Sequence, residues 1–285
     1  MTLALSAADR AALIARHKAA IDGSLKTKLT TIAVVGGLVG LFLYGLTTLE
    51  TSLWKIIAGF SNLGTFVVLM LPPDPGSFAR AVIFVKALFE TIAIAFLGTV
   101  LAAILAFPLG FLADKNVVAN RVVHFLARRS MDTVRGVDAL IWALIWVNVV
   151  GLGPFAGMLA IMTSDLGAFG KLFSEAIESA DRKPVEGVAS VGGGKLHEIR
   201  FGLIPQVLPV IASQVLYYIE SNTRSSTIIG IVGAGGIGLQ LAEQIRVLEW
   251  QKVSFLILMI LVAVAAIDFI SGKLRFAIIG RRAVA

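Results

Sequence analysis

The sequence contains no cysteine, which excludes disulfide scaffolds, thiolate zinc sites, iron–sulfur clusters and cysteine nucleophiles. It has only three histidines, and because they lie far apart we expect no histidine-built metal centre. Charged residues are also scarce, at 15% of the 285 residues, against about 25% in ordinary globular chains. We therefore predict no metal site and assign no catalytic residue.

Apolar residues are correspondingly abundant. They make up 57% of the chain, and the mean hydropathy is +0.88. A globule of 30.2 kDa cannot bury this much apolar surface, so a lipid bilayer must cover the remainder. The composition predicts an all-α, polytopic membrane protein.

Windows that are nearly free of charge predict about six transmembrane helices, because roughly 20 helical residues cross a hydrocarbon core of about 30 Å. A turn of sequence Gly151-Leu-Gly-Pro154 separates the third crossing from the fourth. The predicted crossings are residues 29–46, 81–113, 135–150, 154–173, 201–219 and 253–272.

Two further apolar stretches, residues 56–73 and 225–242, are rich in glycine and poorly suited to a helix that faces lipid alone. We interpret them as re-entrant or surface-lying pieces that pack against protein. The resulting organisation has four parts. They are a cytoplasmic amphipathic segment (1–28), a first crossing with an extracytoplasmic re-entrant or interfacial segment (29–80), a core (81–272) and a cytoplasmic tail (273–285).

The basic residues indicate the orientation. Of the 25 Lys and Arg residues, 19 lie before the first crossing, after the second, after the fourth or after the last, and five lie on the opposite side. Cytoplasmic segments collect Lys and Arg, so both termini are predicted to be cytoplasmic. The net charge of +7 is then a signal of topology, and we do not expect nucleic-acid binding.

Two glycine motifs resemble nucleotide-binding motifs, but the sequence around each lacks features that a nucleotide site requires. Gly233-Ala-Gly-Gly-Ile-Gly238 matches a dinucleotide-binding turn, but only 47 residues follow it, too few for the required sheet. We expect these glycines to pack the segment closely against a neighbouring helix. Gly192-Gly-Gly-Lys195 lacks both the spacing of a P-loop and its Ser or Thr, so any ATPase must be another polypeptide.

The connection between the fourth and fifth crossings, residues 181–202, carries the strongest functional pattern. We predict two short helices, 185–191 and 195–201, hinged at the glycine triplet, with a solvated linker as the alternative. Glu186-Gly-Val-Ala-Ser-Val-Gly192, followed by Gly202-Leu-Ile-Pro205, resembles the EAA signature of binding-protein-dependent ABC transporter permeases. Glu186, Gly192 and Pro205 match in register, whereas Gly187 and Gly202 replace an alanine and an isoleucine.

Other segments resemble the phosphonate-type permeases, and the likeness covers roughly residues 84–270. The segments that carry this likeness are residues 90–99, 170–178, 184–187, 198–209 and 229–238. The resemblance implies a five-helix type I permease core preceded by one extra helix. It also implies the transmembrane subunit of an ATP-driven importer for phosphonates or for phosphite or phosphate. The alternatives are a permease for another small solute such as methionine, or an ion-coupled secondary transporter.

The resemblance further implies partners and a location. The partners would be a second copy of the chain, two cytoplasmic ATPase subunits that hold ATP and magnesium, and an extracytoplasmic binding protein, all at a bacterial inner membrane. This chain itself would be neither an enzyme nor a cofactor carrier. The residues that would couple to the ATPase are Glu186, Gly187, Gly192, Gly193 and Pro205.

A polar cluster after the fifth crossing holds the candidates for the substrate pathway or gate: Glu220, Asn222, Arg224, Ser225, Ser226 and Thr227. Ionisable groups at membrane depth are costly and therefore suggest function. A guanidinium can grip two oxygens of a tetrahedral oxyanion, which suits Arg224. The alternative is that Arg224 pairs with Glu220, four residues away on a helix. Lys86 and Glu90, also four apart, are predicted to pair.

Overall fold

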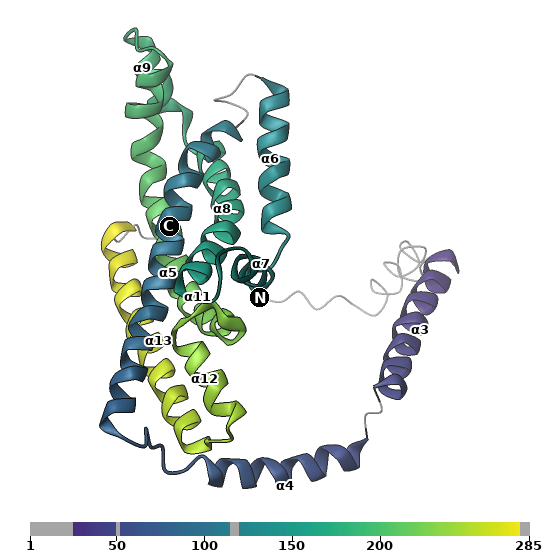
Figure 1. The fold of residues 1–285 in the computed structure, drawn as a ribbon. Helices are drawn as coiled ribbons and strands as arrows, with labels where there is room; N and C mark the ends of the chain where they lie inside the picture. The colour runs from purple at the N-terminus through teal and green to yellow at the C-terminus, as the bar shows by residue number, and fades with distance from the viewer. Residues whose placement is uncertain (1–24, 50–51, 115–119, 280–285) are drawn as a thin grey trace, which may run out of the picture. The chain divides into compact units, whose positions relative to one another are not determined.

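The computed structural model describes residues 25–49, 52–114 and 120–279, and every regular element in these ranges is a helix (Figure 1). The all-α prediction is therefore confirmed. The chain divides into two compact units, the first ending at Thr65 and the second beginning at Phe66. The predicted amphipathic segment lies outside the described residues as far as residue 24.

The first unit contains α3 (Leu25–Thr48) and most of α4 (Leu53–Leu69). Nearly all described side chains of α3 are exposed, including large apolar ones such as Leu41 and Phe42. A helix that is apolar all round suits a bilayer rather than water. The predicted first crossing, residues 29–46, lies entirely within α3.

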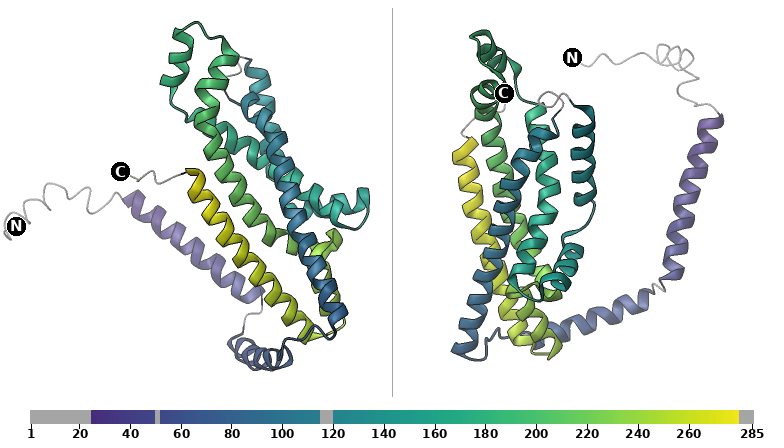
Figure 2. Two further views of the ribbon diagram at one scale, coloured as in Figure 1. Left: turned by 90° about the vertical axis from the view of Figure 1, so that its left-hand side faces the viewer. Right: turned by 45° about the horizontal axis from the view of Figure 1, so that its top comes forward.

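The second unit is built around three helices, α5 (Phe78–Leu112), α8 (Pro154–Glu178) and α11 (Ile204–Ile229), which pack against one another (Figure 2). Buried alanines of α5 let the aromatic rings of Phe169 and Phe173 reach the centre of this bundle. The last helix, α13 (Trp250–Ile279), packs against α11 and α12.

The remaining elements are α6 (Arg121–Arg135), α7 (Ala139–Val150), α9 (Arg182–Ser190), α10 (Lys195–His197), α12 (Gly236–Arg246) and the π-helices η1 (Glu198–Leu203) and η2 (Gly230–Ala234). Four helical runs of the described chain are long and apolar enough to cross a membrane. These are residues 26–48, 78–112, 195–234 and 250–278.

The predicted third crossing differs from the structure. The chain there forms two helices, α6 and α7, bent by 88° and long enough to cross only together. Gly136 ends α6, and the carboxylate of Asp138 caps α7 by accepting a hydrogen bond from the Leu140 N–H at 2.8 Å. Residues 121–135, expected as part of a connection, therefore form a helix that packs along α8. The predicted fourth crossing coincides with α8, which is 25 residues long but is not among the described helices that are apolar enough to cross a membrane. The described residues therefore contain four such runs, or five if α6 and α7 count as one, against about six predicted.

The glycine-rich stretch 225–242 does not turn back as expected. Thr99, Glu90 and Arg80 follow one another along α5, from its middle to its N-terminal end. Asn222 bonds to Thr99, the Gly236 N–H bonds to Glu90, and Gln244 lines the same cavity as Arg80. The chain thus continues along α5 in one direction through α11, η2 and α12.

Glycines and one carboxylate make the break between α11 and α12 possible. Gly233 and Gly235 have φ values of +97° and +83°, and a Cβ on Gly235 would lie 2.7 Å from the Pro154 nitrogen. Glu90 Oε1 accepts a hydrogen bond from the Gly236 N–H at 2.9 Å, and Thr91 Oγ1 accepts one from the Ile237 N–H at 2.7 Å. A carboxylate is favourable at a helix N-terminus.

The close-packing interpretation of the Gly233–Gly238 motif is therefore confirmed. The prediction that Lys86 and Glu90 form an ion pair is wrong. This pair is not among the ion pairs of the described residues, and Glu90 instead caps α12.

Candidate functional site

The loop between α8 and α11 lies at one end of the second unit, where α9 projects beyond the bundle (Figure 1). The carboxylate of Asp181 starts α9 by accepting a hydrogen bond from the Lys183 N–H at 3.0 Å. The first short helix therefore begins at Arg182, three residues earlier than predicted, and Pro184 lies in its first turn. The second is present as α10 and η1, which together end at Leu203.

The glycines of this loop have different roles. Gly192 has a φ of +86°, which favours glycine, but a Cβ added there would meet nothing within 4 Å. A Cβ on Gly193 would lie 2.7 Å from the Val188 carbonyl oxygen, and one on Gly202 would lie 2.8 Å from the Val185 Cα. Gly202, a departure from the EAA pattern, is thus the residue against which α9 packs.

Gln206 fastens the loop to α11, and nothing in the sequence pattern singled it out. Its Nε2 donates to the carbonyl oxygens of Asp181 (3.0 Å) and Gly202 (2.6 Å), and its Oε1 accepts from the Asp181 N–H (3.1 Å). One side chain therefore joins the start of α9, the end of η1 and the start of α11.

Beside this clamp lies a cavity of about 330 Å³ that opens between α9, η1 and the end of α8. Its charged lining includes Glu178, Glu186 and Lys195. Lys195 pairs with Glu198 at 2.8 Å, and Glu178 pairs with Arg128 of α6 at 3.1 Å. Glu186 and Gly187 are exposed on α9, and Pro205 is exposed in the first turn of α11. The arrangement presents a charged, protruding surface suited to contact with another protein.

Asn222, one of the pathway candidates, is buried where three helices meet. Its Nδ2 donates to Thr99 Oγ1 of α5 at 2.8 Å and also to Asp165 Oδ2 of α8. Asp165 is only 5% exposed. The sequence analysis did not select Asp165, because this residue stands at the edge of a charge-free window. The signal that could have revealed it is an acidic residue between apolar helical stretches.

Glu220 and Arg224 belong to an ion-pair network between α11 and α13. Arg275 pairs with Glu220 at 2.6 Å, whereas Arg224 lies 3.6 Å from both Glu220 and Asp268. The four charges cancel. The expected Glu220–Arg224 pair is present, and Asp268 and Arg275 are partners that sequence spacing could not reveal because they lie on another helix.

The hydroxyl candidates are occupied within their own helix. Ser225, Ser226 and Thr227 donate to the carbonyl oxygens of Ser221, Asn222 and Thr223, one turn earlier, at 3.4, 2.7 and 3.4 Å. All six pathway candidates lie in one polar stretch of α11, in which Asn222 and Ser226 are buried and Arg224 is exposed.

In the part of the chain that the structure describes, no group of three or more His, Cys, Asp or Glu residues could hold a metal ion. A family described as "Binding-protein-dependent transport system inner membrane component" matches residues 106–279. Two relatives and one solved structure show how similar the chain is to known proteins.

HtxC of Stutzerimonas stutzeri, named as a phosphite transport system permease, is 42% identical over 225 residues, covering 79% of each chain. Phosphite transport system permease protein PtxC of the same organism is 33% identical over 248 residues, covering 87% of this chain and 88% of that protein. An inward-facing structure of the MetNI methionine ABC transporter matches with a TM-score of 0.63 at 18% identity. It covers 71% of this chain and 99% of that one, which shows a shared fold.

These matches confirm the resemblance seen at the EAA-like segment. The matched region runs from the second half of α5 to the end of α13 and so includes the loop and the polar stretch of α11. The chain belongs to the binding-protein-dependent transport system inner membrane component family, and it is a permease subunit rather than an enzyme in its own right.

Proposed function

We propose that this permease imports a phosphorus oxyanion (phosphite, phosphate or a phosphonate) across a bacterial inner membrane, with ATP and magnesium held by partner subunits. The loop clamped by Gln206 carries the proposal, because it offers a partner a protruding surface joined directly to a crossing helix. The names of HtxC and PtxC support the choice of cargo.

In the proposed assembly two copies of the chain form the pathway. Two ATPase subunits dock on the α9 loops, and a binding protein delivers cargo at the opposite face. Both termini are cytoplasmic, in keeping with the distribution of Lys and Arg. Glu186, Gly187, Gly192, Gly193 and Pro205 form the coupling surface.

The first test is purification in mild detergent. We expect the wild-type chain to retain a stoichiometric ATPase subunit and Glu186→Arg to lose it, since reversing a charge in an interface opposes association. Glu243→Arg makes the same charge change on α12, which lies at the other end of the unit, and should retain the ATPase. A wild-type chain that purifies alone would contradict the proposal.

Arg224 allows a test of the pathway candidates. Its guanidinium is about half exposed and lies at 3.6 Å from two carboxylates, and such exposed pairs are worth at most about 1 kcal/mol. We therefore expect Arg224→Gln to reduce phosphite uptake by less than about fivefold. A loss of uptake approaching a hundredfold, with normal amounts of folded protein, would instead assign Arg224 to cargo binding.

A further inference from the structure

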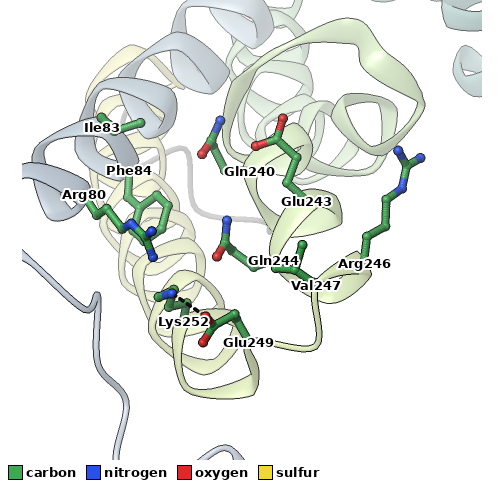
Figure 3. A pocket seen from close by; sticks show the side chains of 10 residues that line it. All are labelled: Arg80, Ile83, Phe84, Gln240, Glu243, Gln244, Arg246, Val247, Glu249 and Lys252. Carbon is green, nitrogen blue, oxygen red and sulfur yellow. Dashed lines mark ion pairs between the residues drawn. The ribbon is translucent and has the colours of Figure 1, made fainter.

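A second cavity lies at the opposite end of α5 from the coupling loop (Figure 3). The coupling-loop cavity includes Asp114, just beyond the end of α5, whereas this one includes Arg80, in the first turn of α5. Its volume is about 620 Å³, and it opens between α5, α12 and the start of α13. On the proposed topology this end faces the extracytoplasmic side.

Lys252 places a largely buried positive charge in the wall of this cavity. The residue is 8% exposed, and its Nζ pairs with Glu249 Oε1 at 2.9 Å. A charge withdrawn from water in this way is costly unless other groups compensate it. Lys252 is therefore held in the wall by specific contacts and differs from an ordinary surface lysine.

The segment between α4 and α5 holds Lys252 in place. Met70 accepts a hydrogen bond from Ser254 Oγ at 2.6 Å, and the Asp74 N–H donates to the Gln251 carbonyl at 3.2 Å. A Cβ on Gly76 would lie 3.0 Å from Lys252 Cε, so the absence of a side chain at Gly76 lets this segment close over the lysine. The end of the Lys252 side chain therefore lies between Gly76 and Glu249.

Arg80 supplies a second cation. Its side chain extends toward Gln244, and Gln240 lies one turn away on the same face of α12 (Figure 3). None of the ion pairs among the described residues includes Arg80. The guanidinium of Arg246 points away from Arg80 and Lys252 (Figure 3).

The positive charge of Arg80 is not neutralised by an ion pair. Lys252 pairs with Glu249, and no ion pair among the described residues joins Arg80 to the remaining carboxylate of the lining, Glu243. A planar guanidinium can hold two oxygens of a tetrahedral oxyanion at once, and an amide N–H can hold another. The Arg80 guanidinium and the Gln244 amide thus suit a small oxyanion.

We propose that this cavity binds a phosphorus oxyanion, gripped by Arg80 and assisted by the charge of Lys252 and the amide of Gln244. The assignment rests on the proposed function, and it places a cargo-binding step at the outer end of the unit, before the polar stretch of α11. A phosphate group of an anionic lipid offers the same chemistry at this end of the bundle, so the source of the oxyanion is part of the test.

The experiment measures direct binding of phosphite and methylphosphonate to the full chain in lipid nanodiscs, without ATPase or binding protein. We expect saturable binding by the wild type and at least tenfold weaker binding by Arg80→Gln. Arg246→Gln removes the same charge from the same rim and should bind within twofold of the wild type. Gln244→Glu, which places a carboxylate where the Arg80 guanidinium points, should also weaken binding at least tenfold and serves as a second probe.

Nanodiscs of phosphatidylcholine alone and nanodiscs that contain phosphatidylglycerol distinguish the two sources. Equal binding in both supports a site for soluble cargo, and binding that phosphatidylglycerol suppresses supports a site that accepts lipid phosphate. Wild-type binding that Arg80→Gln leaves unchanged would overturn the inference, as would the absence of binding by the wild type. Either result would leave retention of the ATPase, the test of the proposed function, unaffected.

Discussion

Replacing Gly192 with valine is expected to leave the chain in the membrane with its ATPase attached, and to lower ATP-driven uptake more than tenfold. Gly192 has a φ of +86°, a conformation that costs an L-residue about 1–2 kcal/mol and a β-branched residue more. Since Gly193 packs directly against Val188, relieving that strain must change how α9 sits on η1. ATP hydrolysis should continue without driving transport.

The matched control is Gly194→Val, two residues further along the same turn. Gly194 also has open space around an added Cβ, but its φ of −77° is one that valine adopts readily. Uptake and ATP hydrolysis are measured together in proteoliposomes that contain the whole complex. If Gly192→Val transports as well as Gly194→Val, the turn has no role in coupling.

Replacing Gly238 with valine is expected to prevent the chain from folding. A Cβ on Gly238 would collide with the Thr227 carbonyl oxygen and lie 3.0 Å from the Gly230 Cα. Overpacking costs about 1–3 kcal/mol even where side chains can move aside. The obstructing atoms here belong to backbone, so α12 can no longer dock beside the end of α11.

The comparison for this variant is Gly272→Val, because Gly272 lies in α13 and an added Cβ there would meet nothing within 4 Å. Size-exclusion chromatography of detergent extracts measures the yield of monodisperse protein. Gly272→Val should resemble the wild type, and Gly238→Val should be lost to aggregation or degradation. Recovery of monodisperse Gly238→Val at wild-type yield would contradict the packing argument.

Helices of uniform apolar character could be predicted from the sequence, and the broken ones could not. Residues 29–46 and 253–272 lie within α3 and α13 because both stretches are strongly apolar, with Asp268 as their single charged residue. The 88° bend between α6 and α7 depends on Gly136 and Asp138, two residues whose local signals are weak. The direction of α12 depends on Glu90, 146 residues away from Gly236, and no local pattern reveals such a partner.

The same division applies to the candidate site. Glu186, Gly192 and Pro205 could be recognised because they follow one another in a short segment of known spacing. Asp165 and Arg275 contact the candidates only after helices far apart in the sequence have packed together. Gln206 bonds to Asp181, 25 residues earlier, once the loop has folded back on α11. The sequence therefore pointed to the loop between α8 and α11 but could not identify the side chains that anchor this loop and the polar stretch.

The Gln206 clamp has a mechanical consequence. Two hydrogen bonds join Gln206, in the first turn of α11, to Asp181 at the start of α9, and a third joins it to Gly202 of η1. The connection between α9 and α11 is therefore rigid rather than flexible. Because α11 leads to the buried bonds that Asn222 makes with Thr99 and Asp165, a rotation begun at the loop is carried as torque to the place where three helices meet.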